Sequence, residues 1–421
     1  MTDSSISSTS RSTPDQVGAA SAQAQRRSAL VTVMFTNALL SLGFQLWRSL
    51  FNNFAVADLG VRADQMGLIQ SIREVPGLLG FGVAFLALLL SEMRLAAWSV
   101  VLMGIGVAMT GRAVGMSGLL ISTLVMSVGL HVFMPCTSSA VLMLVGKDEA
   151  PRVLGRLNSL GALAALVGAA IVILGLDVLG FRVLFYATGA LLILGGLAVL
   201  PWSRKPIQPP GEPSSELLAR TPTRGRISLR RRYWLYHALQ LLMGSRRHMF
   251  TTFAVFLLVQ QHGVSAQAIT VLFLINSVIG TFLFQRFGKL IARFGERRVL
   301  TVDFLLLIIV FLGYAFIPLL PVLYVLFVID QILFGFSIAL QSYLQKIALR
   351  PQDLMPTVSM GQTMNHVAAV GIPLVGGVVW ETVGSRYTFL IGVGIAVLSL
   401  VLVQWMRTET EGTPRTAAVK P

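Results

Sequence analysis

The chain has 421 residues, of which 55% are hydrophobic and only 12% are charged, and its mean hydropathy is +0.76. Charged residues make up about a quarter of ordinary soluble domains, so this composition excludes a soluble globular protein. The formal net charge is +15 at pH 7. In so apolar a chain, that charge has to be interpreted by its position relative to a membrane.

Apolar runs long enough to cross a bilayer follow one another along the chain. A helix needs about 20 mostly apolar residues to span the hydrocarbon layer. The runs predict an all-α polytopic membrane protein with twelve transmembrane helices, at residues 29–57, 66–90, 95–111, 117–144, 153–176, 180–201, 233–260, 266–287, 299–318, 321–345, 357–382 and 387–406.

Polar segments divide these runs into two sets of six. Residues 1–28, rich in Ser, Thr, Gln and Ala, predict a disordered tail, and residues 408–421 predict a second tail. Residues 203–232 contain five prolines and eight basic residues, which is typical of a solvated linker. The linker separates an N-terminal six-helix bundle at 29–202 from a C-terminal one at 233–407.

The basic residues lie unequally on the two sides of the expected membrane. With both tails on one side, 25 Lys and Arg residues fall on the side of the tails and linker, and four on the other. The positive-inside rule makes the richer side cytoplasmic. We therefore expect an integral protein of a bacterial inner membrane with both termini cytoplasmic, its charge setting topology and contacting anionic lipids, with no role in binding nucleic acid. The single Cys136 gives no disulfide and no cysteine metal site.

A short phrase from the first run returns in the seventh. "RSLFNNFAV" at 48–56 and "RHMFTTFAV" at 247–255 share five of nine residues at an offset of 199. One shared residue is an arginine inside a predicted span, which apolar composition alone does not produce. Repeats of six spans in the same direction are a transporter architecture.

Two motifs lie in the second half of the chain, "GIPLVGGVVWETVG" at 371–384 and "GKLIARFGERR" at 288–298. The first is similar to the glycine-rich eleventh span of the major facilitator superfamily. "GKLIARFGERR" at 288–298 resembles its loop signature after the second span of a half, although Ala292 replaces the usual acidic residue and the first-half loop keeps little beyond Arg94. Pattern positions fall on Gly288, Arg293, Gly295, Arg297 and Arg298. The resemblance covers residues 29–407 and implies two pseudo-symmetric six-helix bundles, alternating access, and a part for this motif in the cytoplasmic gate.

Matching polar stripes run along the first and seventh spans. An arginine at a helix centre costs about 2.5–3.5 kcal/mol on insertion scales, so it persists where it faces a watery cavity. The resemblance implies that these two helices face each other across the central cavity, where Arg48 and Arg247 would converge on an anion. The supporting candidates are Gln45, Asn52, Gln240, Thr251 and His131. The alternative is that Arg48 extends toward the outer interface.

Acidic residues inside the predicted spans are candidates for coupling. A carboxylate desolvated at Asp330 or Glu74 has the property that a proton-coupling site needs. The alternative is a static ion pair, for example between Glu74 and its neighbour Arg73. His131 and His366 have a default interpretation as hydrogen-bonded core residues, with His131 the stronger functional candidate by helix position.

The sequence therefore predicts a monomeric secondary active transporter for a small, anionic organic solute, with protons as a candidate coupling ion. It contains no phosphate-binding loop, nucleophile motif or metal-ligand spacing, so we expect neither an enzyme nor a cofactor. Two alternatives stay open. One is a proton-driven exporter of drugs or metabolites, in which the acidic residues bind substrate and the arginines are structural. The other is a non-transporting receptor or assembly partner that docks through the linker.

Overall fold

The protein is described here from a computed structural model. The structure describes residues 14–80, 86, 89–145, 149–204, 231–348 and 351–407. Most of the expected tails and linker, at 1–13, 205–230 and 408–421, lie outside the described residues.

The first half of the chain is a series of long helices. In chain order its elements are α1 (Pro14–Asn53) with the π-helical η1 (Phe54–Asp58), α2 (Ala63–Leu78), α4 (Glu92–Arg112), α5 (Met116–Leu144), α6 (Ala150–Val199) and the short η2 (Trp202–Arg204). The 50-residue α6 contains Gly180 at φ 74°, a conformation that glycine adopts without strain. This break divides α6 into two spans where the sequence predicts the boundary.

The second half repeats this plan. Its elements are η3 (Arg231–Tyr233), α8 (Trp234–His248), η4 (Met249–Ala254), α9 (Val255–Gln260), α10 (Ala266–Phe294), α11 (Glu296–Phe316), α12 (Leu320–Phe334), η5 (Gly335–Ser337), α13 (Ile338–Ile347), α14 (Pro351–Thr382) and α15 (Ser385–Val403). The segments α8–η4–α9 and α12–η5–α13 each form one span. No strand occurs among the described residues, so the all-α fold is confirmed. Eight helices of the described part of the chain are long and apolar enough to cross a membrane. With α6 divided at Gly180, and with α2, α8–η4–α9 and α10 added, the described segments follow the twelve predicted spans.

One boundary differs from the prediction. The first helix begins at Pro14, so residues 14–28, which were expected in a disordered tail, are helical. Alanine, glutamine and arginine are strong helix formers, and "AASAQAQRR" directly precedes the apolar run. The polarity of this segment therefore does not prevent it from extending the helix.

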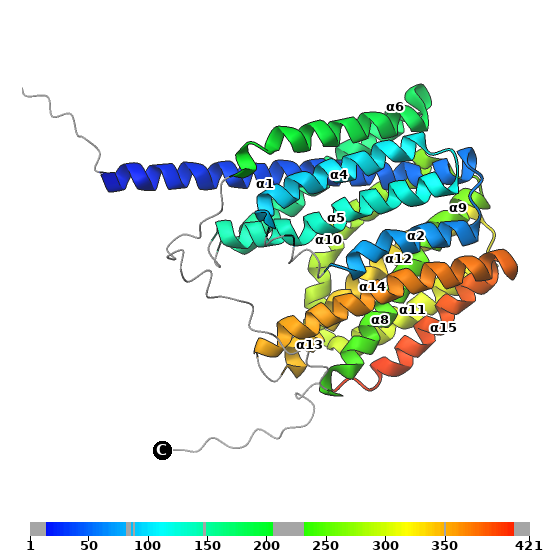
Figure 1. The fold of residues 1–421 in the computed structure, drawn as a ribbon. Coiled ribbons are helices and arrows are strands. Elements are labelled where there is room, and N and C mark those ends of the chain that lie inside the picture. Colours follow the sequence, from blue (N-terminus) through cyan, green and yellow to red (C-terminus); the bar gives the residue numbers. More distant parts are fainter. Residues whose placement is uncertain are drawn as a thin grey trace, which may run out of the picture.

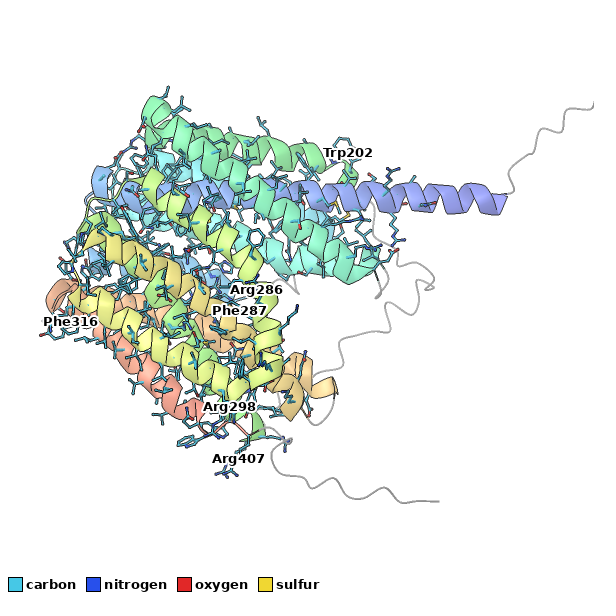
Figure 2. The ribbon with its side chains drawn as sticks, turned by 180° about the vertical axis from the view of Figure 1, so that it is seen from behind. Trp202, Arg286, Phe287, Arg298, Phe316 and Arg407 are labelled. Carbon is cyan, nitrogen blue, oxygen red and sulfur yellow. The ribbon has the colours of Figure 1, made fainter. Side chains whose placement is uncertain are left out.

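Large apolar side chains cover the outside of both halves. Leu174 and Val178 on α6 are 77% and 82% exposed, and Phe282 on α10 is 70% exposed. Apolar surface of this extent is not stable in water and is suited to lipid. Figure 2 places Trp202, Arg298 and Arg407 near one end of the helices and Phe316 at the other end of α11, as expected for residues near the two interfaces.

The two halves meet mainly through α2 against α14 and α6 against α10. The end of the molecule where Trp202–Arg204 closes the first half and Arg231–Tyr233 opens the second is called the linker face below. In Figure 1 the halves come together away from the linker face, with α2 running beside α14, and they diverge toward it.

Polar contacts hold the halves together at the face opposite the linker. The Asn53 side chain donates to the carbonyl oxygen of Val264 over 2.7 Å, and the Gln267 amide donates to Asp177 over 2.7 Å. Arg62 on the first half lies 3.4 Å from a carboxylate oxygen of Glu381 on the second. The molecule is therefore closed at this face.

Glycines bring α2 and α14 into backbone contact. A Cβ atom built on Gly377 would lie 2.6 Å from the carbonyl oxygen of Ala63 and 3.2 Å from the Cα of Gly67. The hydroxyl of Ser71 donates to the carbonyl oxygen of Val370 over 2.6 Å, which fixes the register of the two helices. The closed face thus depends on the lack of a side chain at position 377.

Gly377→Val is expected to shift the protein away from this closed arrangement. Overpacking costs about 1–3 kcal/mol, which corresponds to a roughly 5- to 150-fold change in the ratio of states. The measurement is maleimide labelling of a single cysteine placed at the buried Ala63, with Cys136 replaced by serine. Gly371→Val on the same helix is the control, because a Cβ there meets open space. Equal labelling of the two valine variants would contradict the expectation.

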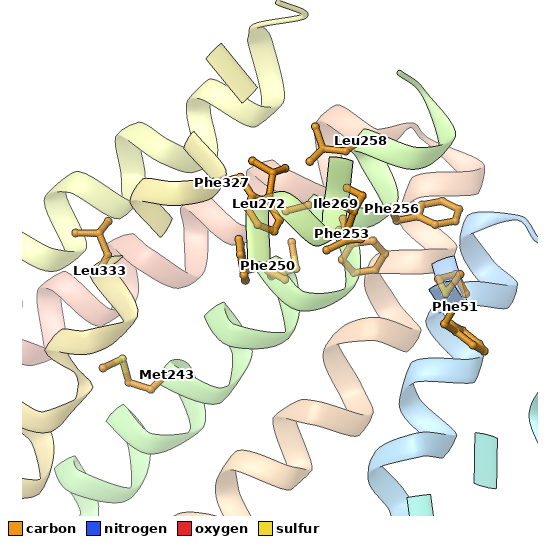
Figure 3. Close-up of a cluster of buried hydrophobic side chains, with 14 of the residues drawn as sticks. Phe51, Met243, Phe250, Phe253, Phe256, Leu258, Ile269, Leu272, Phe327 and Leu333 are labelled. Atoms are coloured by element: carbon orange, nitrogen blue, oxygen red, sulfur yellow. The ribbon is translucent and has the colours of Figure 1, made fainter. Parts of the chain in front are cut away.

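The phenylalanines of the repeated phrase lie in the core. Phe51, Phe250 and Phe253 are at most 6% exposed, and they appear in the buried cluster of Figure 3 with Phe327 and Leu272. Both copies of the phrase also leave α-helical geometry, through η1 and η4. π-helical segments are often found at functional sites. Here η4 begins two residues after Arg247, and η1 begins six residues after Arg48.

Candidate functional site

Arg48 on α1 points toward the other half of the molecule. Its guanidinium carbon lies 4.2 Å from the centre of the Phe273 ring on α10, a favourable cation–π distance. The side chain is half-buried, and its Nε atom is buried without a hydrogen-bond partner. This position between the halves differs from the alternative in which Arg48 extends to the outer interface.

Arg247 on α8 also lies on the inner side of its half. Its guanidinium carbon is 5.4 Å from the Phe334 ring of α12, and it interacts electrostatically with Glu74 and Arg73 of the first half. The residue is exposed although the neighbouring Glu74 is buried. The Arg247 side chain is therefore accessible although it lies near a buried carboxylate. Neither Arg247 nor Arg48 forms an ion pair with any described residue.

The four polar residues of the two stripes differ in their partners. Gln45 donates to the Ser49 hydroxyl over 3.1 Å, and Gln240 donates to the Tyr236 hydroxyl over 2.9 Å. Asn52 Oδ1 and Thr251 Oγ1 are buried and have no hydrogen-bond partner. Buried polar atoms without a partner are uncommon in folded proteins. Asn52 and Thr251 are therefore free to hydrogen-bond to a ligand. The two glutamines already form hydrogen bonds within their own helices.

Glu74 on α2 is the centre of a cluster between the halves. Arg73 donates to its Oε1 atom through Nη2 over 2.7 Å and through Nε over 3.1 Å. The Oε2 atom faces two histidines, with His366 Nδ1 at 3.4 Å and His131 Nε2 at 3.8 Å. The structure thus brings together Glu74, Arg73 and His131, and it adds His366 of α14, which the sequence favours only as a core residue.

Asp330 belongs to a separate, fully buried group within the second half. Arg246 donates from Nη1 to both carboxylate oxygens of Asp303, over 3.1 and 2.9 Å, and its Nη2 lies 3.5 Å from Asp330 Oδ1. None of the three side chains is more than 3% exposed. Asp330 thus contacts Arg246 as the ion-pair alternative expects, and a coupling role for Asp330 stays a prediction.

Asp303 is the member of this group that the sequence reasoning missed. It stands alone in the apolar run "TVDFLLLIIV" at 301–310. A lone carboxylate in a membrane span is costly unless it is paired. The sequence could therefore have indicated that Asp303 needs a partner. The sequence does not show that its partner is Arg246 on another helix.

The loop motif between α10 and α11 makes its contacts inside the second half. Gly295 has φ 80° and joins the two helices at a sharp turn. Arg297 donates to Gln404 over 3.3 Å, and Arg293 lies over the Phe294 ring, whereas Gly288 and Arg298 are exposed. The gate role of Gly288, Arg293, Gly295, Arg297 and Arg298 stays a prediction.

Within the loop motif, Glu296 forms a hydrogen bond and an ion pair with α13. It accepts from the Ser342 hydroxyl over 2.6 Å and lies 2.7 Å from the Lys346 ammonium group. These bonds tie the start of α11 to α13. They were not predicted from the sequence, because Lys346 and Glu296 lie on segments that only the fold brings together.

Comparison with known proteins identifies the family. The sequence profile of the Major Facilitator Superfamily matches residues 33–359. The chain belongs to the major facilitator superfamily. It is accordingly a membrane transporter and not an enzyme.

Solved structures of transporters share the fold. The nucleoside transporter NupG is 16% identical with a TM-score of 0.73, covering 90% of this chain and 98% of that chain. A bacterial homolog to the human lysosomal transporter Spinster, inward-facing and unoccupied, is 17% identical with a TM-score of 0.70, covering 90% and 96%. The peptide transporter POT is 15% identical with a TM-score of 0.67, covering 90% and 94%. A comparison with curated proteins gives no significant match.

Proposed function

We propose that this superfamily member is a secondary active transporter that moves a small anionic organic solute by alternating access, with Arg48 and Arg247 as ligands of the anion. The observation that carries the proposal is that each half contributes one arginine without an acidic ion-pair partner among the described residues. Arg48 lies over Phe273 of the other half, and Arg247 is within electrostatic reach of Glu74. Bidentate hydrogen bonds from guanidinium groups suit carboxylates and phosphates.

The charges inside the membrane support an anion. Arg73 is paired with Glu74, and Arg246 is shared between Asp303 and Asp330. Arg48 and Arg247 have no such partner among the described residues. Because an unpaired charge in a low-dielectric setting is costly, a bound anion would stabilise both. The unpartnered Asn52 and Thr251 side chains are placed on the same two helices to complete its hydrogen bonds.

The sidedness follows from the basic residues. Arg286, Arg293, Arg297, Arg298 and Arg407 gather toward the linker face, which the positive-inside rule makes cytoplasmic. The arrangement closed at the other face is then inward-facing, in an inner membrane with both termini in the cytoplasm. Each half supplies one arginine, so one chain completes the site and can act as a monomer. Proton coupling at Glu74 or Asp330 stays a prediction.

A thermal-shift screen of the purified protein tests the substrate class. A ligand at 100 times its Kd stabilises the folded state by about 2.7 kcal/mol. We expect carboxylates or phosphate esters to raise the unfolding temperature, and neutral nucleosides and cationic drugs to leave it unchanged. The shift should disappear in Arg48→Gln and Arg247→Gln. Stabilisation by cations instead of anions would refute the proposal and favour the exporter alternative.

A further inference from the structure

Three potential metal ligands meet between the halves. Glu74 of α2, His131 of α5 and His366 of α14 offer ligand atoms that all lie within 4.8 Å of one another. We propose that these three side chains bind a divalent transition-metal ion of the zinc class, and that the bound ion clamps the two halves together. The site does not depend on which solute the protein transports.

The donor set and its spacing suit such an ion. Zinc is commonly held by two histidines and one glutamate, with a fourth position open, at about 2.0–2.1 Å from each ligand. In a tetrahedron these lengths put neighbouring donors about 3.3 Å apart. The Oε2 atom of Glu74 is already 3.4 Å from His366 Nδ1 and 3.8 Å from His131 Nε2. Calcium and magnesium prefer oxygen ligands and are excluded by the two imidazoles.

Neighbouring groups orient the ligand atoms. His131 Nδ1 lies 3.0 Å from the carbonyl oxygen of Ser127 and 3.0 Å from its hydroxyl oxygen. The hydroxyl donates its own hydrogen to the carbonyl oxygen of Arg73, so both oxygens of Ser127 can accept from the histidine. The hydrogen on Nδ1 therefore points to Ser127, and the Nε2 lone pair faces the cluster. Arg73 occupies Oε1 of Glu74 and leaves Oε2 free to bind. Metal-binding histidines and carboxylates are generally held by outer partners of this kind.

The cluster also offers a second imidazole nitrogen as a metal ligand, and it has space beside Gly77. His366 Nδ1 is buried and makes no hydrogen bond of regular geometry, and it lies 3.4 Å from Glu74 Oε2. A Cβ atom on Gly77 would lie only 2.7 Å from His131 Nε2, so a glycine at this position keeps the ligand accessible. The positive charges of Arg73 and Arg247 oppose a bare dication. The fourth ligand is accordingly an anion, such as chloride.

The clamp follows from the origin of the ligands. Glu74 and His131 belong to the first half and His366 to the second. A conformation that separates α2 from α14 divides this set and loses the ion. Because a ligand shifts an equilibrium toward the state that it binds better, the ion stabilises the arrangement described here.

Zinc binding to the purified full-length protein, stripped with a chelator, tests the site. Titration with zinc chloride should show one ion per chain. Outer-shell changes alone weaken metal sites about 10- to 100-fold, so Glu74→Gln, His131→Gln and His366→Gln should each weaken binding by at least about tenfold. His262→Gln, in the turn after α9, is the matched control and should bind zinc as the unchanged protein does. Circular dichroism melting verifies that each variant is folded.

Cobalt(II) absorption and maleimide labelling test the ligand geometry and the clamp separately. Cobalt(II) in place of zinc should give the visible absorption of a tetrahedral site in the unchanged protein and lose it in His366→Gln. Zinc should also slow maleimide labelling of the cysteine at position 63 in the unchanged background but not with His366→Gln. Binding that survives the loss of His366, or no zinc binding by the folded protein, would overturn the site. An unchanged labelling rate would overturn the clamp.

Discussion

Arg247→Gln and Arg48→Gln are each expected to abolish transport while leaving the protein in the membrane. Each change removes a charge-assisted hydrogen bond worth about 1.5–3 kcal/mol, which corresponds to about ten- to hundredfold weaker binding of the anion. Since neither guanidinium group is paired with an acidic residue, its loss leaves no buried carboxylate unpaired. The measurement is counterflow of the anion found in the thermal-shift screen, in vesicles that contain equal amounts of each variant.

Two control substitutions separate the geometry of the arginine from the general loss of a positive charge. Arg48→Lys keeps the charge but loses bidentate geometry, so we expect intermediate transport. Arg112→Gln, at the exposed end of α4, removes an arginine away from the site and should transport normally. Normal transport by Arg48→Gln would refute the assignment of this residue. Loss of protein from the membrane in both glutamine variants would favour a structural role for the arginines.

Arg246→Met, one residue from Arg247, is expected to destabilise the fold. Arg246 is 1% exposed and holds both Asp303 and Asp330. Removing one partner of a buried ion pair costs about 3–5 kcal/mol, because the remaining charge is left without compensation. The measurement is the thermal unfolding temperature of the purified variant together with its yield in the membrane.

A second substitution separates charge from packing. Arg246→Met combined with Asp303→Asn removes the unpaired carboxylate nearest to position 246, so it should recover part of the lost stability. Arg247→Gln should unfold at the temperature of the unchanged protein. The prediction fails if Arg246→Met is as stable as Arg247→Gln.

Hydropathy was sufficient to predict the fold, because each span has to be apolar over its whole length. The break at Gly180 and the boundaries of α4, α5 and α15 lie within a few residues of the predicted ones. Side-chain polarity did not predict that the first helix begins at Pro14, because a polar segment can extend an apolar helix. The π-helical turns at η1 and η4 are likewise not predictable from periodicity, since they depend on how the repeated phrases pack.

The candidate site was predictable where one helix carries the signal. Arg48 and Arg247 stand out because each is a charged residue in an apolar span and because they repeat. Pairs that form between helices were not predictable in the same way. Asp303 with Arg246, and His366 with Glu74, come from segments more than fifty residues apart. Sequence spacing therefore showed no metal ligands, although the fold brings three together.

The contact of α2 with α14 has a consequence for the speed of the transport cycle. Around Gly67 and Gly377 the two helices touch through main-chain atoms. Interlocked side chains must change rotamer before two helices can slide past each other, whereas smooth backbone surfaces have no such obstacle. The contact between α2 and α14 at this face can therefore separate without rotamer changes around these two glycines. The hydrogen bonds and the ion pair across this face are then the polar contacts that must break.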